Sequence, residues 1–174
     1  MTTQRRLLDG TDATVRPISP SDADALVRFH EALSSSSQRS RFFAIHPHLT
    51  AKEVHRFTTV DHRDREALVV ASGSEILGVG RYDRLPDTTD AEVAFVTRDD
   101  VQGLGIATLL FDELATAADA VGITRFVAET LPENRKMLDV FTRTGLVSSR
   151  VFGRGVFSVI LAMAAVRGGG VTPW

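Results

Sequence analysis

The chain has 174 residues, of which 43% are hydrophobic and 24% charged, and its formal net charge is −2. These proportions are typical of a globular protein and exclude disorder and fibrous repeats. The absence of cysteine excludes disulfides, thiolate metal sites and catalysis through a covalent cysteine intermediate. The small net charge gives no electrostatic reason to expect nucleic acid or an anionic membrane as a partner.

Targeting and domain signals are weak along the whole chain. The N-terminus lacks the apolar stretch of a signal peptide, and the apolar run at 159–166 is too short to cross a membrane. We therefore expect a cytoplasmic protein. Because no repeat or linker divides the chain, we expect a single domain over residues 1–174, with a core from about 12 to 163 and a mobile tail at 164–174.

The first third of the chain predicts a strand at 12–17 followed by a helix. Ser19 is placed to cap that helix, on which apolar residues recur with helical spacing over 23–33. The Ser- and Arg-rich segment 34–43 is interpreted as a loop or a short helix. A second capping box, beginning at Thr50, predicts a helix that reaches about Phe57.

The remainder predicts six strands and two helices in a mixed α/β order rather than a βαβ array. The strands are expected at 67–72, 75–82, 91–97, 125–129, 147–152 and 156–163, and the helices from the glycine turn to about 120 and at 133–144.

The glycine turn at 102–107 lies between a strand and a long helix. Glycines let the backbone turn tightly and approach a ligand, and the free N–H groups of the helix N-terminus suit a phosphate. A Walker loop is excluded because the chain has no Gly-Lys pair. A dinucleotide fold has weak support. Glu129 lies at a suitable distance downstream, but Thr108 stands where the third glycine would be. A turn that merely joins two elements is the remaining alternative.

Residues 91–110 resemble the acetyl-CoA-binding core of the GNAT N-acetyltransferases. The family's Gln/Arg-x-x-Gly-x-Gly/Ala turn is matched by Gln102, Gly105 and Ala107, and residues 133–145 are similar to its fourth helix. The similarity extends over about residues 13–163. Within the superfamily, the chain most resembles the GNAT domain of bacterial Pat-type protein-lysine acetyltransferases. The segments that carry this narrower match are 16–18, 41–43, 60–61 and 91–95.

The resemblance implies a fold and a cofactor site. The fold is an α/β GNAT fold, with a mixed, mostly antiparallel sheet of about seven strands, about four flanking helices and a central splay at a bulge. Acetyl-CoA is the implied acyl donor, with no metal. The implied cofactor contacts are Phe95, Val96 and Thr97 on the strand, Gln102, Gly103, Leu104, Gly105, Ile106, Ala107 and Thr108 at the turn, and Asn134 on the next helix.

Two of these positions carry an alternative or a departure from the family. Asn134 is also explained as a polar group that begins a helix. Position 104 is often Arg or Lys in the family and is Leu here, which implies weaker contacts with adenine or phosphate.

Acetylation of an amine requires its neutral form, yet a lysine amine has a pKa near ~10.4, so a base is needed. The Pat-type resemblance implies Glu92 as this base, whereas Glu129 occupies the position of the base in some other GNAT enzymes. Each is also explained as an exposed strand carboxylate. The family's helix-four tyrosine is replaced by Phe141, which excludes tyrosine as the acid at that position. We expect direct attack in a ternary complex, with a strand N–H near Val96 polarising the thioester carbonyl.

The resemblance favours a protein lysine as the acceptor. A small amine, an antibiotic or a protein N-terminus is an alternative, as is a CoA-binding sensor without turnover. The serines at 34–37 with Arg39 and Arg41 either line the acceptor entrance or form a solvated loop. Histidines 46, 48, 55 and 62 are spaced too loosely to predict a metal site. The oligomeric state and any regulatory partner stay unspecified.

Overall fold

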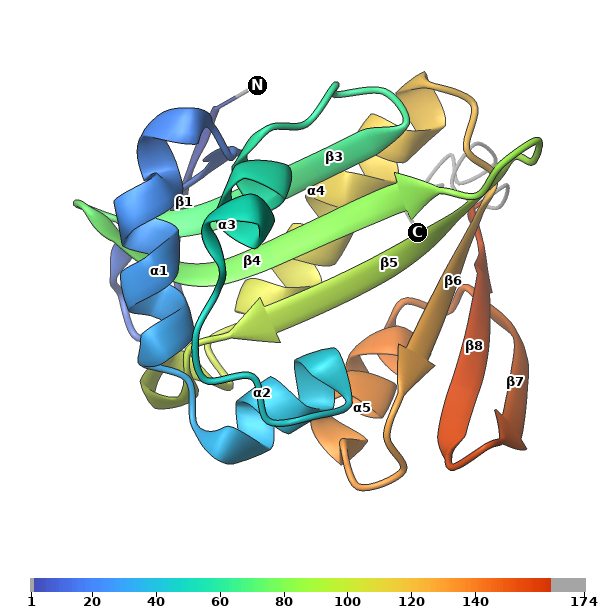
Figure 1. Ribbon diagram of the computed structural model, residues 1–174. Helices are drawn as coiled ribbons and strands as arrows, with labels where there is room; N and C mark the ends of the chain where they lie inside the picture. The colour runs from blue at the N-terminus through green and yellow to red at the C-terminus, as the bar shows by residue number, and fades with distance from the viewer. Residues whose placement is uncertain (1, 164–174) are drawn as a thin grey trace, which may run out of the picture.

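One eight-stranded sheet organises the chain in the computed structural model, which describes residues 2–163 (Figure 1). The expected tail lies outside the described residues. The strand order is β1-β2-β3-β4-β5-β6-β8-β7, and every neighbouring pair is antiparallel except β5 with β6. The strands are β1 (Thr3–Arg6), β2 (Asp12–Pro17), β3 (Arg65–Ser72), β4 (Glu75–Arg84), β5 (Asp90–Thr97), β6 (Arg125–Thr130), β7 (Val147–Gly153) and β8 (Val156–Ala162).

Five α-helices and two short 3-10 helices connect these strands within the described part of the chain. They are η1 (Pro20–Asp22), α1 (Ala23–Glu31), α2 (Ser35–Phe42), α3 (Ala51–Thr58), η2 (Asp99–Val101), α4 (Ile106–Ala120) and α5 (Arg135–Arg143). The predicted GNAT fold is confirmed, with a mostly antiparallel sheet and helices on both faces.

One strand was not expected from the sequence, and the segment expected as a loop or a short helix forms a helix. The structure adds β1, whose polar sequence Thr-Gln-Arg-Arg shows no apolar alternation and which is defined only by its pairing with β2. The segment at 34–43 forms α2, which begins where the hydroxyl of Ser34 accepts a hydrogen bond from the Ser37 amide. The sheet therefore has eight strands rather than about seven, and five helices surround it rather than about four.

The helices bury the two faces of the sheet in separate apolar clusters. Helices α4 and α5 cover one face, where a larger cluster is centred on Leu110, Phe111 and Leu114 of α4. Helices α1 and α3 lie on the other face, in front of the sheet in Figure 1, over a smaller cluster that includes Leu26 and Phe29. The sheet thus presents different chemistry on its two sides.

Glycines in β4 allow α4 to lie close to the sheet. An ideal Cβ on Gly78 would stand 2.6 Å from the Ile106 side chain of α4. One on Gly80 would stand 3.0 Å from the Leu114 side chain of α4 and 2.9 Å from the Phe95 ring of β5. Real Cβ atoms do not approach other atoms this closely, so the helix would have to shift. These glycines therefore set the position of the N-terminus of α4, where the glycine turn ends.

The central feature is a fork between β5 and β6. Their parallel pairing runs only from Asp90–Arg125 to Glu92–Val127. Beyond that point β5 stays paired with β4 as far as Thr97, and β6 stays paired with β8 as far as Thr130. The two strands consequently diverge toward the end of the sheet where α2 and α5 lie (Figure 1).

The expected bulge does not cause this divergence. Register between β4 and β5 is continuous from Arg84–Ala91 to Gly78–Thr97, without a shift. The splay arises instead because each strand follows its own antiparallel partner.

None of the helices in the described residues is both long and apolar enough to span a membrane.

We predict that Gly78→Ala destabilises the protein by roughly 1–3 kcal/mol, because its Cβ would press on the Ile106 side chain and displace α4. Gly153→Ala is the matched control, since an ideal Cβ there has no atom within 4 Å. Urea unfolding of both variants measures the difference. Equal free energies of unfolding for the two variants would contradict the close packing of α4 on β4.

Candidate active site

The gap between the diverging strands exposes backbone groups of β5. The amide of Arg98 donates to the carbonyl of Leu77, which marks a hydrogen-bonded pair at the end of the β4–β5 ladder. Because such pairs alternate along an antiparallel ladder, the peptide groups of Val96 face β4 and those of Phe95 and Thr97 face the gap. Backbone groups left without partners inside a protein are costly, so these positions favour a ligand or water.

The glycine turn forms a second set of free donors. Gly103 and Gly105 have φ angles of +84° and +85°, a backbone conformation that glycine adopts without strain. The first helical bond of α4 runs from the Leu109 amide to the Gly105 carbonyl, so the amides of residues 106–108 have no acceptor within the helix. An ideal Cβ on Gly103 meets no atom within 4 Å. The turn is therefore open and presents several N–H groups at a helix N-terminus, a favourable place for a phosphate.

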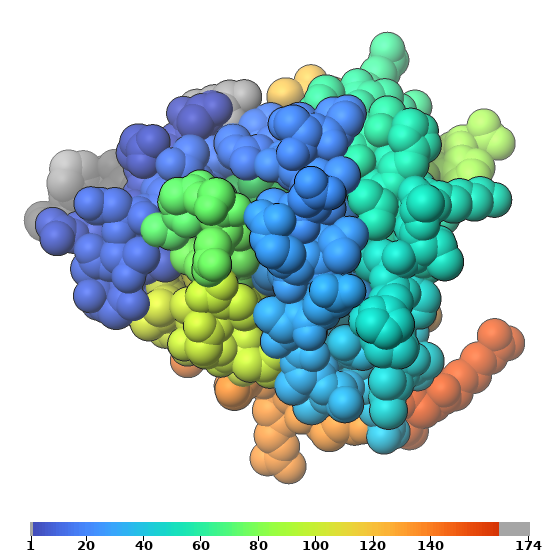
Figure 2. Space-filling view, turned by 60° about the vertical axis from the view of Figure 1, so that its left-hand side comes forward, coloured from blue at the N-terminus to red at the C-terminus, as the bar shows by residue number. Residues whose placement is uncertain are grey.

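Side chains from two other elements hold this turn in place. The carboxylate of Asp99 accepts hydrogen bonds from the Ser34 amide at 2.9 Å, the Ser34 hydroxyl at 2.8 Å and the Ser37 hydroxyl at 2.7 Å. Burial acts to raise the pKa of Asp99, but the bonds from Ser34 and Ser37 outweigh it and keep the pKa below its ordinary value. Figure 2 shows the η2 segment packed against the junction of α1 and α2.

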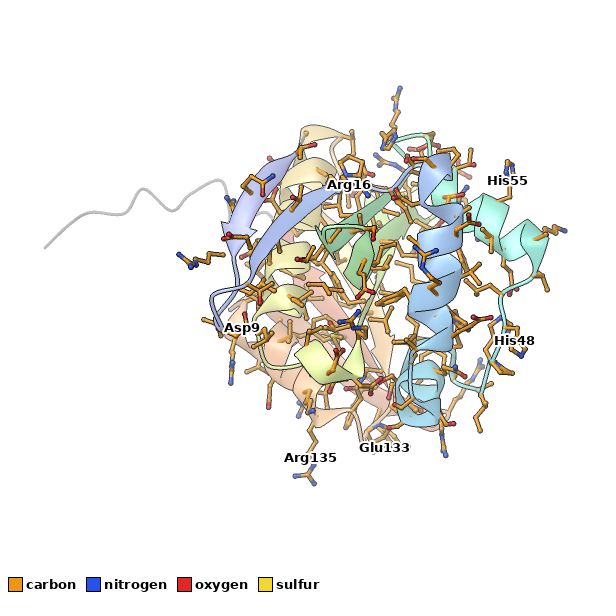
Figure 3. The ribbon with its side chains drawn as sticks, turned by 90° about the vertical axis from the view of Figure 1, so that its left-hand side faces the viewer. Asp9, Arg16, His48, His55, Glu133 and Arg135 are labelled. Atoms are coloured by element: carbon orange, nitrogen blue, oxygen red, sulfur yellow. The ribbon has the colours of Figure 1, made fainter. Side chains whose placement is uncertain are left out.

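Gln102 completes the connection to α5. Its side-chain oxygen accepts a hydrogen bond of 2.7 Å from the Lys136 ammonium, and its amide donates to the Ser37 hydroxyl at 3.4 Å. Glu133, at the lower edge of Figure 3, forms an exposed ion pair with Arg39 of α2 at 3.6 Å. The turn, α2 and α5 therefore surround the open end of the fork.

Asn134 begins α5, where its side-chain oxygen accepts from the Met137 amide at 3.3 Å. This is the capping role that was the alternative explanation, and it leaves the amide nitrogen of Asn134 available to a ligand. Leu104, the departure from the family pattern, is partly buried against the larger core cluster. Its side chain contributes apolar packing in place of a positive charge.

The two candidate bases lie on the same face of the sheet. Glu92 is the last residue of β5 paired with β6. It points to the same face of the sheet as Val96, which packs beneath α1. Glu129 points to the same face of the sheet as Val127, which is paired with Glu92. Both carboxylates are exposed, and neither makes a hydrogen bond or ion pair with a described residue. Glu92 therefore lies at the fork itself, and Glu129 lies along its β6 arm.

Phe141 occupies an apolar position rather than a catalytic one. It is 2% exposed, and its ring centroid lies 6.4 Å from that of Phe95 on the gap-lining strand. Tyr82 is fully buried in β4, where its hydroxyl donates to the Arg63 carbonyl and burial raises its pKa to about 12. Neither residue can supply a proton to a leaving group in the gap.

No pattern in the chain singles out Thr130, which lies at the end of β6. Its hydroxyl is buried without a hydrogen-bond partner among the described residues. Buried polar atoms are rarely unsatisfied, so this hydroxyl has room for a hydrogen bond to a ligand or water. The orphaned hydroxyl, the free β5 amides and the open glycine turn together fit an extended ligand that carries amides and a phosphate group.

A small cavity of about 40 Å³ lies between the sheet and α1–α3, on the face that carries Glu92. Its wall is mainly apolar but includes Arg41 and Arg81. No group of three or more His, Asp or Glu side chains suitable for a metal occurs among residues 2–163.

Together, a forked parallel pair, free amides along one of its strands and an open helix N-terminus beside it are the features expected of a CoA-dependent acyltransferase. The family model of the acetyltransferase (GNAT) domain matches residues 12–147. The chain therefore belongs to the GNAT family, whose acetyltransferases use acetyl-CoA.

Known proteins narrow the similarity further. The crystal structure of the GNAT domain of S. lividans PAT is 41% identical and superposes with a TM-score of 0.87, covering 92% of this chain and 96% of that one. Acetyltransferase Pat of Mycolicibacterium smegmatis is 32% identical over 136 residues, 76% of this chain. The chain spans only 40% of the length of that relative.

A more distant structure shows the fold alone. The acetyltransferase yncA of Salmonella typhimurium, solved with its cofactor acetyl-CoA, is 16% identical, has a TM-score of 0.69 and covers 86% of this chain and 91% of its own. The predicted membership of the GNAT family is confirmed, and the chain is similar to Pat-type members.

We predict that Gly105→Val weakens acetyl-CoA binding at least about tenfold, because a β-branched residue is strained at φ +85° and would distort the turn. Gly122→Val is the matched control. Its φ is +76° and it also has open space around it, but it lies beyond the other end of α4. Calorimetric titration measures both affinities. Equal weakening by the two variants would show that backbone strain, and not the turn, determines binding.

Proposed function

We propose that the protein transfers an acetyl group from acetyl-CoA to a primary amine, preferably a protein lysine, with Glu92 as the general base. The observation that carries this proposal is the position of Glu92, where the pairing of β5 and β6 ends. Its carboxylate is exposed and free of described partners, and the gap-facing amides of Phe95 and Thr97 follow on the same strand. A base and oxyanion donors are thus held on one rigid strand.

Acetyl-CoA supplies the acetyl group as a thioester. In a ternary complex, Glu92 accepts a proton from the ammonium form of the amine, and the freed nitrogen lone pair attacks the carbonyl carbon. The second proton, which the nitrogen loses as the amide forms, passes to the CoA thiolate after it leaves. The carbon–sulfur bond breaks, and CoA leaves as a thiolate. A thiol titrates near ~8.5, so the thiolate departs without an acid. This agrees with the absence of a tyrosine hydroxyl from position 141.

The remaining proposed contacts concern cofactor binding. A gap-facing amide adjacent to Val96 donates to the thioester carbonyl oxygen of acetyl-CoA. The amides of residues 103–108 hold the pyrophosphate of the cofactor. The free amide nitrogen of Asn134 and the hydroxyl of Thr130 face the pantetheine arm of CoA, which joins the thioester to the pyrophosphate. Gln102 acts by positioning the turn, because its side chain is already bonded to Lys136 and Ser37.

A protein lysine is the acceptor that the relatives support. The S. lividans PAT GNAT domain and the curated Pat acetyltransferase are the matches on which this choice rests. We also propose that the protein acts in the bacterial cytoplasm, on the same basis.

We predict that Glu92→Gln lowers the acetylation rate by roughly 10²-fold or more, because a neutral amide cannot take the amine proton. The acetyl-CoA dissociation constant should stay unchanged, since the substitution preserves size. Glu129→Gln is the matched control and should retain most of the rate. Release of CoA thiol gives the rates and calorimetry gives the affinities.

The opposite pattern, with Glu129→Gln inactive and Glu92→Gln active, would transfer the role of base to Glu129. Acetyl-CoA binding by a wild-type protein that acetylates no amine would instead favour a CoA-binding sensor.

A further inference from the structure

Arg41 stands out among the arginines because it is shielded and yet has no anionic partner. The described arginines that are not exposed are Arg16, Arg41, Arg65, Arg81, Arg84 and Arg98. Each of these except Arg41 forms an ion pair with an aspartate or glutamate. Arg41 makes no hydrogen bond or ion pair with any residue in the described range, and its charged group is 4.9 Å from the centre of the Phe42 ring.

The surroundings of Arg41 explain why an anion is needed there. Burial, and after it the charge of Arg81, lower the pKa of Arg41 to about 10, so the side chain still carries its charge at neutral pH. Asp83 is not available as a partner, because its carboxylate already accepts from Arg81 at 2.7 Å and Arg65 at 3.0 Å. A guanidinium held beside a second guanidinium favours any anion that reaches it.

Glu92 is the other nearby carboxylate. It favours the charged form of Arg41 electrostatically, but the two side chains form no ion pair in the described part of the chain. The base and the guanidinium are therefore neighbours that leave each other free. An amine substrate would be drawn to Glu92, and an anionic group on a substrate would be drawn to Arg41.

The shape of the site limits the size of that anionic group. Arg41 and Arg81 both line the cavity on the Glu92 face, along with Val96 of β5. Its volume of about 40 Å³ holds only a few water-sized groups. This is room for a small group such as a carboxylate, which a guanidinium binds in a two-bonded, planar arrangement.

We propose that Arg41 forms a carboxylate-binding subsite beside Glu92, which selects a substrate that carries a carboxylate close to the reacting amine or acyl group. The subsite deepens the proposed function and rests on it. Two substrates can supply the carboxylate: an acidic residue or carboxyl group of the acceptor, or the far end of a dicarboxylic acyl group on CoA.

The first experiment, the acceptor arm of the test, varies the acceptor. It compares two blocked pentapeptides with one central lysine, which is flanked by glutamates in one peptide and by glutamines in the other. A parallel pair, β-alanine and β-alaninamide, covers small acceptors. With acetyl-CoA as donor, the wild type should prefer the carboxylate member of a pair by roughly tenfold in kcat/KM. Arg41→Gln should abolish the preference and Arg41→Lys should restore part of it. A purely structural role would lower the rates for both members alike.

Arg39→Gln is the matched control for the loss of charge. Arg39 is on the same helix, but it is exposed, pairs with Glu133 and does not line the cavity. This variant should keep the wild-type preference. Circular dichroism and acetyl-CoA affinity establish that Arg41→Gln remains folded.

The second experiment, the acyl arm of the test, varies the acyl group on CoA and measures binding without an acceptor. Calorimetry compares the binding of succinyl-CoA and acetyl-CoA to the wild type and to Arg41→Gln. Tighter binding of succinyl-CoA that Arg41→Gln removes would support the subsite and assign the carboxylate to the acyl group.

The failures of the two proposals are distinct. A wild type that acetylates no amine contradicts the proposed function, and the acyl arm then decides the subsite alone. The subsite is overturned if no carboxylate preference that depends on Arg41 is found in either arm.

Discussion

The structure depends on the point at which β5 and β6 stop pairing. Because β5 follows β4 and β6 follows β8, the sheet divides after Glu92 and Val127 while each half keeps its own ladder. The division leaves peptide groups of Phe95 and Thr97 without strand partners. An unpaired backbone is costly in a protein interior, so the fold carries a built-in demand for a hydrogen-bonding ligand. The arm of CoA carries amide groups that can form such hydrogen bonds, which is why we propose that it binds in the fork.

The helices turn this gap into a site with two distinct sides. On one side, Gly78 and Gly80 let α4 approach the sheet, and this brings the amides of the glycine turn to the mouth of the fork. On the other side, α1–α3 leave a small cavity with Arg41 and Arg81 in its wall. Asp99 joins the two sides, because it lies just before the turn and binds Ser34 and Ser37 of the α2 N-terminus. The glycine turn and the cavity thus lie on opposite sides of the sheet, and the hydrogen bonds of Asp99 connect the segments that form them.

Local patterns predicted the local parts of this arrangement. The glycine turn, the capping boxes and the amphipathic helices depend on neighbouring residues, and the turn and α3 are found where expected. Long-range pairing was less predictable: β1 has no apolar alternation, and the splay forms without the expected bulge. The Thr130 hydroxyl and Arg41 are notable because each lacks a partner among the described residues of the folded protein. The spacing of residues in the sequence does not predict such a missing partner. The resemblance to Pat-type enzymes implied Glu92 as the base, and the register shows that the pairing of β5 and β6 ends at this residue.

The most direct measurement is residue-resolved amide hydrogen exchange by NMR, with and without acetyl-CoA. If the cofactor lies between β5 and β6, the Phe95 and Thr97 amides should exchange more slowly on binding. The Val96 amide, which already faces β4, should change little. Saturating acetyl-CoA that leaves Phe95 and Thr97 unprotected would contradict the placement of the cofactor in the fork.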